Sequence, residues 1–177
     1  MTNDTNELAS GQLWVYKLVF RFMLKTNSRG RIANDSDCHA IILISELINS
    51  ARNRVDVYCK RLSDDVWGSD TVISAIKAAL LRGVIFHVAV QASKDQCKDS
   101  RAFRIFAEKC VRVINLDCGA ENGREIPVKA NFVLVDGKSF RFEPDPDKHK
   151  GFAYACNEEM AKQLQTAFYD KIWNRKS

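Results

Sequence analysis

Residues 126–143 read IPVKANFVLVDGKSFRFE. The apolar run 132–135 ends in Asp136-Gly137, a dipeptide that is typical of tight turns between antiparallel strands. Residues 139–142 then alternate between polar and aromatic side chains, as a second strand does. This stretch therefore predicts a β-hairpin, with its polar residues at the entrance to the first strand and at the turn.

Helical and strand-like patterns alternate before this hairpin and continue after it. Helices are predicted within 36–51, 69–83, 101–109 and 157–173, and further strands at 54–59, 84–90, 111–116 and 151–156. The intervening polar segments are predicted as connections, at 26–34, 92–100, 117–125 and 144–150. Such an order indicates an α/β fold, in which a mixed β-sheet is flanked by helices.

The apolar segment 13–25 is compatible with two structures. With a period of two, its aromatic residues fall on one face and indicate a strand. With a helical period, Lys17, Arg21 and Lys25 form one basic stripe on an otherwise apolar cylinder, and we favour this helix. Packing on the core is the ordinary interpretation of such a segment, a docking face for a second subunit is the sharper one because so much apolar surface is hard to bury on one small domain, and a membrane-surface helix is a third. The candidate interface residues are Trp14, Tyr16, Phe20 and Phe22.

Positive charge gathers in the same region. The formal net charge of the 177 residues is +5, which permits contact with nucleic acid without requiring it. Ordinary solvated charge is the alternative explanation of such a cluster. We divide the chain into an N-terminal extension, 1–34, and a domain, 35–177. The candidate nucleic-acid contacts are Lys17, Arg21, Lys25, Arg29 and Arg31.

The six cysteines form no C-x-x-C pair and no zinc-finger spacing with the three histidines. Free thiols in apolar segments favour a reduced, cytoplasmic protein. Residues 1–10 are polar, so no signal peptide is predicted, and no apolar run is long enough to span a bilayer. No motif for a metal or another cofactor is recognised.

The hairpin resembles the signature of the phospholipase D superfamily, H-x-K-x4-D followed by glycine. In this register Asp136-Gly137 takes the aspartate-glycine position, Asn131 stands where the family has lysine, and Lys129 stands where it has the nucleophilic histidine. The order of elements over 35–174, which ends in F-x4-W, is similar to one half-domain of that superfamily. The resemblance therefore implies a half-domain with two of its three functional side chains replaced.

In that superfamily two motifs act together, from two halves of a chain or from two copies. One histidine attacks phosphorus, the other protonates the leaving oxygen, and the lysines hold phosphate oxygens. An ammonium at Lys129 has no lone pair, and Asn131 has no charge. The resemblance thus implies a pseudoenzyme without catalytic residues. His149, in a loop near the last strand, is the candidate for displaced catalysis.

Two outcomes are predicted for the altered pocket. An ion pair of Lys129 with Glu143 or with Asp136 would convert the pocket into a structural network, because a buried charge needs a partner. Alternatively, the pocket retains an anion site. The candidate residues are Lys129, Asn131, Asp136, Arg141 and Glu143.

The resemblance implies a non-catalytic binding, regulatory or assembly module that forms a homodimer or joins a protein partner in a larger complex. By analogy with small bacterial members of the superfamily, it implies a nucleic-acid-related or antiviral defence system. The alternatives are a metal-independent phosphodiesterase or nuclease with a displaced active site, and a non-catalytic nucleic-acid binder.

Overall fold

A computed structural model places residues 3–118, 128–146 and 150–174, with the backbone alone for residues 3–10. The helices are α1 (Asn3–Thr26), α2 (Asp37–Ser50), α3 (Asp70–Leu81), α4 (Lys94–Cys97), α5 (Arg101–Glu108), α6 (Glu158–Phe168) and the π-helical turn η1 (Tyr169–Trp173). The strands are β1 (Arg31–Asn34), β2 (Arg54–Cys59), β3 (Ile85–Val90), β4 (Val113–Asn115), β5 (Asn131–Val135), β6 (Ser139–Asp145) and β7 (Lys150–Tyr154).

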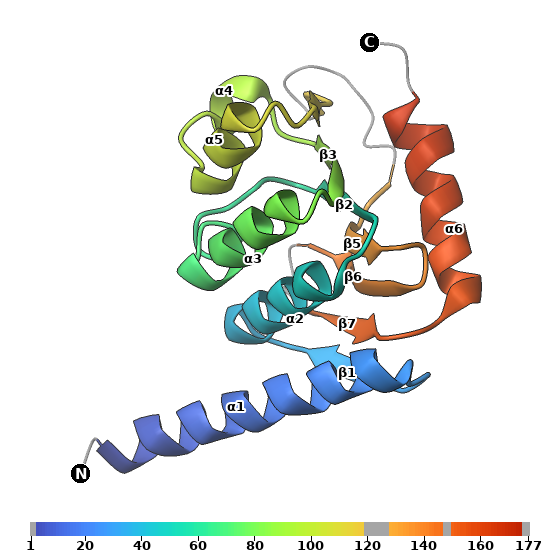
Figure 1. The fold of residues 1–177 in the computed structure, drawn as a ribbon. Coiled ribbons are helices and arrows are strands. Elements are labelled where there is room, and N and C mark those ends of the chain that lie inside the picture. The colour runs from blue at the N-terminus through green and yellow to red at the C-terminus, as the bar shows by residue number, and fades with distance from the viewer. Residues whose placement is uncertain (1–2, 119–127, 147–149, 175–177) are drawn as a thin grey trace.

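The strands of the described residues form one mixed sheet in the order β1-β7-β6-β5-β2-β3-β4 (Figure 1). β2, β3 and β4 run parallel to one another, and every other neighbouring pair is antiparallel. Helices connect the parallel strands, as such crossovers require. The α/β class predicted from the sequence, a mixed sheet flanked by helices, is confirmed.

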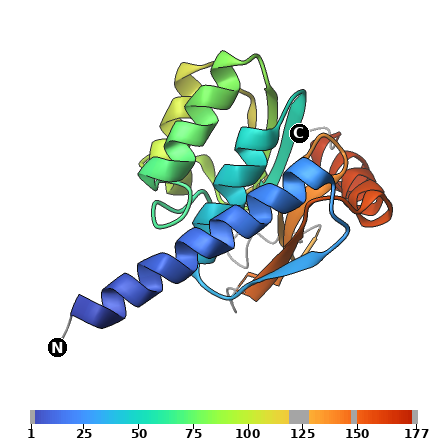
Figure 2. The same cartoon turned by 60° about the horizontal axis from the view of Figure 1, so that its bottom comes forward.

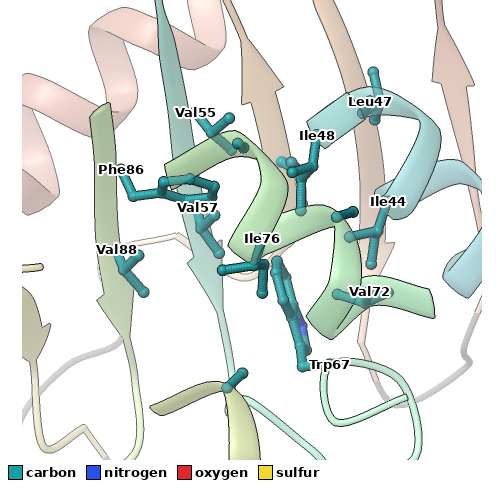
Figure 3. Close-up of a cluster of buried hydrophobic side chains, with 14 of the residues drawn as sticks. Ile44, Leu47, Ile48, Val55, Val57, Trp67, Val72, Ile76, Phe86 and Val88 are labelled. Carbon is teal, nitrogen blue, oxygen red and sulfur yellow. The ribbon is translucent and has the colours of Figure 1, made fainter. Parts of the chain in front are cut away.

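Helices α2, α3 and α5 cover one face of the sheet and enclose the larger hydrophobic cluster. Val57 of β2 and Val88 of β3 point into this cluster and lie near Ile48 of α2 and Ile76 of α3 (Figure 3). All four side chains are fully buried. Burial of one such side chain stabilises the fold by about 1.5–3 kcal/mol, so this layer holds the parallel strands in place.

The C-terminal helix α6 and the turn η1 cover the opposite face. Phe132 and Leu134 of β5 pack there against Phe168, while Val133 and Val135 of the same strand join the α2 cluster. Successive residues of a strand point to opposite faces. The continuous apolar run of β5 is therefore a strand that is buried on both sides.

The long helix α1 packs against α2, and its N-terminal half projects from the body of the protein (Figure 2). The helix predicted over 13–25 is confirmed, and the strand alternative is wrong. Phe20 is fully buried in the same cluster as α2. The second half of α1 is therefore anchored by core packing.

The predicted hairpin is confirmed by the register of β5 and β6, which pairs Val135 with Ser139. Asp136 and Gly137 both have positive φ, at 50° and 69°, as tight hairpin turns require. The predicted start of the helix within 36–51 is also confirmed. The side chain of Ser36 accepts a hydrogen bond from His39 N at 3.2 Å at the start of α2.

Three predicted connections contain regular structure. Residues 31–34 form the edge strand β1, which pairs with β7, so the sheet extends across the predicted boundary at residue 34. The segment 92–100 contains α4, which a capping box at Ser93 starts. β6 continues through Pro144 to Asp145, beyond the end predicted for it, after an irregularity in the register. Residues 147–149 of that connection, and residues 119–127, lie outside the described residues.

Candidate functional site

The two polar motif positions of the hairpin lie at opposite ends of β5. Asn131 is the first residue of the strand and Asp136 follows its last residue, so about 16 Å of extended chain separates them. Lys129 precedes the strand, and its side chain is exposed and makes no hydrogen bond or ion pair with a described residue. The structure thus brings Asn131 together with Arg141 and Glu143 and leaves Asp136 apart from them.

Both ends of the Asn131 amide are hydrogen-bonded inside the protein. Its Nδ2 donates to Glu143 Oε2 at 2.7 Å, and its Oδ1 accepts from Lys60 N at 2.8 Å. Asn131 and Glu143 are direct cross-strand partners. The amide therefore ties the start of β5 both to β6 and to the chain that leaves β2.

Arg141 and Glu143 form a buried ion pair beside Asn131, and each is only 5% exposed. Arg141 Nη2 donates to Glu143 Oε1 at 3.3 Å, and Arg141 Nε donates to Asn34 Oδ1 at 2.8 Å. A buried charge is tolerated when it is paired and hydrogen-bonded. A structural network does occupy this position, but its cation is Arg141, and the predicted ion pair of Lys129 with Glu143 does not form.

Asp136 anchors the segment that joins α2 to β2. Its carboxylate accepts from the backbone N–H groups of Arg52 and Asn53 at 2.9 Å and of Arg54 at 2.8 Å. The predicted ion pair of Lys129 with Asp136 does not form either. The motif aspartate therefore has a structural role and is not part of a common anion site with Asn131.

A cleft of about 740 Å³ opens where the parallel strands β2 and β3 end. In open α/β sheets this edge is the usual place for a ligand. Asn131, Arg141 and Glu143 form part of the wall. Other polar residues of the wall carry both signs of charge and several amides: Asp37, Lys60, Arg61, Asp65, Gln91 and Gln96.

The described wall of the cleft offers groups for binding, and its hydroxyl and thiol groups come from Tyr58, Ser63, Cys59 and Cys118. It includes no histidine, and His149 lies outside the described residues. Burial raises the pKa of the Cys59 thiol, which keeps it protonated and unreactive. Within 3–118, 128–146 and 150–174, no group of three metal-binding side chains is assembled.

A second polar cluster, which the sequence analysis did not identify, lies on the α6 face of the sheet. Tyr169 Oη donates to Asp56 Oδ1 at 3.0 Å and lies 2.6 Å from His87 Nδ1. Asp56 and His87 are cross-strand neighbours on β2 and β3. Arg54 Nε donates to the other carboxylate oxygen of Asp56 at 3.1 Å. One observable signal was the aspartate inside the apolar strand 54–59, because a buried carboxylate needs partners.

Burial shifts the pKa values of Asp56 and His87 in this second cluster. It raises the pKa of Asp56, an effect that the nearby Arg54 opposes. It also lowers the pKa of His87, an effect that Asp56 opposes. The His87 ring stacks on Trp173 with centroids 4.5 Å apart. The cluster thus joins the C-terminal turn η1 to the centre of the sheet.

The predicted interface residues on α1 divide into two sets. Trp14 and Phe22 are 62% and 67% exposed. Tyr16 stacks on His39 with centroids 4.2 Å apart, and Phe20 is fully buried. Phe20 lies in the core, so its prediction as an interface residue is wrong, whereas Tyr16 is half-buried against α2 and stays a prediction.

Three of the five candidate nucleic-acid contacts interact with other residues of the protein. Arg21 Nε and Nη2 each donate to the buried Glu46 at 2.8 Å, and Lys17 lies 3.6 Å from the same carboxylate. Arg31 stacks over the ring of Phe152. The remaining candidates, Lys25 and Arg29, are exposed to solvent.

The fold and the cleft define a mixed α/β domain with a ligand-sized opening at the ends of two parallel strands. The chain belongs to the family described as "Domain of unknown function (DUF7931)", whose model matches residues 36–177. No curated protein matches the chain. In the described part of the chain, no helix combines the length and apolar character needed to cross a membrane.

Among solved structures, the chain is similar to TrmBL2, an archaeal chromatin protein whose structure is described as showing a novel mode of DNA binding. The two share 12% identity, with a TM-score of 0.56 over 98% of this chain. This chain spans 64% of the length of that TrmBL2 chain. At this identity the likeness concerns the fold.

Proposed function

We propose that this protein is a non-catalytic binding module on a phospholipase D-like scaffold, and that the cleft at the ends of β2 and β3 is its ligand site. The observation that carries the proposal is that the side chains at two motif positions are hydrogen-bonded to other parts of the protein. Asn131 is hydrogen-bonded to Glu143 and to Lys60 N, and Asp136 is hydrogen-bonded to three backbone N–H groups. Neither side chain is positioned to act on a phosphate.

The wall of the cleft supports binding of a polar ligand. Lys60 and Arg61 provide cationic side chains, and Gln91 and Gln96 provide amides that both donate and accept hydrogen bonds. A volume of about 740 Å³ lies within the range of small-molecule sites. The Arg141–Glu143 pair in the same wall carries no net charge, so it contributes a fixed polar surface rather than an unpaired charge.

The test is a hydrolysis assay combined with a binding screen. Purified protein is incubated with a model phosphodiester and with single-stranded DNA across a range of pH, with and without a chelator, and no cleavage is expected. Binding of polar metabolites is then screened by thermal shift, with Gln91→Ala as the cleft variant and Lys77→Ala, a substitution outside the cleft, as its control. Cleavage that disappears in His149→Ala or Lys129→Ala would establish the displaced active site instead.

A second candidate function is non-catalytic binding of nucleic acid. The likeness to a DNA-binding chromatin protein favours it, together with the exposed Lys25 and Arg29 and the net charge of +5. Its affinity should fall steeply with salt, because each cationic contact with phosphate releases counterions. Fluorescence anisotropy with labelled duplex and single-stranded DNA measures this slope, and Lys25→Glu/Arg29→Glu should reduce it. An affinity that does not change with salt would rule this function out.

A further inference from the structure

The outer face of α1 carries a continuous apolar stripe. Five large side chains on it are between 39% and 67% exposed: Trp14, Val15, Leu18, Val19 and Phe22. Their spacing places them on one side of the helix, opposite the side that packs on α2. The part of the chain that the structure describes leaves this stripe uncovered, and Figure 2 shows α1 at the outside of the molecule.

The stripe is large enough to form an interface. From the exposed fractions, and with about 200 Å² for an aromatic side chain and about 150 Å² for an aliphatic one, it presents roughly 500 Å² of apolar surface per chain. Exposed patches of that size on a single chain commonly mark a binding surface. Two such stripes in contact bury roughly 1,000 Å², which reaches the lower limit for a specific protein interface.

The geometry points to a second copy of this chain as the occupant, with the two α1 helices packed antiparallel across a two-fold axis near Leu18. The stripe is nearly symmetric about this residue, because Trp14 lies four positions before it and Phe22 four positions after it. A two-fold axis at Leu18 therefore places Trp14 of one copy beside Phe22 of the other, twice. A self-complementary patch of this kind is what an isologous dimer interface requires.

The charges that border the stripe favour a second copy over an acidic partner. Three cations lie along one edge of the stripe: Lys17 and Arg21 are engaged by the buried carboxylate of Glu46, and Lys25 is exposed. An anionic membrane or a nucleic acid would have to compete with Glu46 for Lys17 and Arg21. Two antiparallel copies avoid that competition, and they hold the two exposed Lys25 side chains about 21 Å apart along the axis. The inference uses none of the cleft residues and stands independently of the proposed function.

The mass of the full chain in solution tests the inference. We expect light scattering during gel filtration to give the mass of two chains. Leu18→Glu places two carboxylates near each other at the two-fold axis and should raise the dissociation constant at least about 100-fold, which leaves single chains. Phe22→Glu, at the edge of the same stripe, should act in the same direction. Leu81→Glu, a change at an apolar side chain that is 86% exposed on α3, is the matched control and should stay dimeric.

Three results would overturn the inference. The first is a wild-type chain that has the mass of one copy at all concentrations. The second is a Leu18→Glu variant that keeps its helical circular dichroism and remains dimeric. The third is a monomer that binds phosphatidylcholine–phosphatidylserine vesicles through the same stripe, which would make a membrane surface the occupant.

A distance measurement tests the orientation of the helices. Spin labels are placed at Lys25→Cys in a chain whose exposed or partly exposed cysteines are replaced by serine, namely Cys38, Cys110, Cys118 and Cys156. Position 25 lies seven helical steps beyond position 18, so antiparallel helices hold the two labelled positions about 21 Å apart along the axis. A parallel pair would hold them only about 10 Å apart across the interface, and that result would contradict the antiparallel arrangement.

Discussion

Replacement of Asp136 by alanine should destabilise the fold strongly, although the residue lies in a surface turn. Its carboxylate accepts three backbone hydrogen bonds, from Arg52, Asn53 and Arg54. A hydrogen bond to a charged group contributes about 1.5–3 kcal/mol, and we reduce this to about 1 kcal/mol each because Arg52 and Asn53 are exposed to water. The loss of the three bonds is therefore about 3 kcal/mol.

The backbone of Asp136 adds a further contribution. Its φ of 50° lies in the left-handed region, where alanine is disfavoured by about 1 kcal/mol. The expected loss for Asp136→Ala is thus about 4 kcal/mol, a large part of the 5–15 kcal/mol that stabilises a typical domain. Asparagine accepts the left-handed conformation and keeps one acceptor oxygen, so Asp136→Asn should lose only about 1–2 kcal/mol.

Equilibrium unfolding in urea, followed by circular dichroism and tryptophan fluorescence, measures these differences. Lys138→Ala is the control in the same turn, because its partly exposed side chain donates a single hydrogen bond to Asn27 Oδ1 and should change stability by less than about 1 kcal/mol. If the free energy of unfolding of Asp136→Ala lies within about 1 kcal/mol of the wild-type value, the carboxylate does not anchor this segment and the structural role assigned to it is wrong.

Three other substitutions test separate parts of the fold by the same unfolding titration. Arg141→Met leaves the buried Glu143 without its cation and should lower stability by about 3–5 kcal/mol, and a loss below about 1 kcal/mol would contradict the buried pair. Phe20→Ala should lower stability by about 3–5 kcal/mol, and an unchanged midpoint would mean that α1 is not part of the cooperative core. Burial lowers the pKa of His87 below 6.5, so the native state binds fewer protons than the unfolded state. Stability should therefore decrease as the pH falls below about 6.5, and His87→Gln should flatten that part of the profile; an identical slope in the variant would refute the assignment.

The hairpin and the helices that flank the sheet were predictable because their determinants are local. The Asp136-Gly137 turn fixes the register, and counting outward from it places Asn131 opposite Glu143. The register places Asn131, rather than Lys129, directly across from Glu143. The contact between Asn131 and Glu143 was therefore available from the sequence.

Other features depend on contacts between distant parts of the chain. Tyr169 and Asp56 are 113 residues apart, and no local pattern pairs them. β1 has only four residues and is stabilised by its pairing with β7 rather than by its own composition. The segment 13–25 is apolar on two faces because one packs on α2 and the other is exposed, so its sequence lacks the one-sided pattern that identifies most helices.

The π-helical turn η1 covers part of one face of the sheet, so the cover of that face depends on the last residues of the turn. In η1 the N–H of Asn174 donates to the carbonyl of Tyr169 at 3.1 Å, five residues back, which accommodates one residue more than an α-helical turn. Tyr169 and Trp173, at the two ends of this turn, both contact the ring of His87, with centroids 5.9 Å and 4.5 Å away. Removal of the residues from Trp173 onward would therefore expose the face of the His87 ring that the indole now covers.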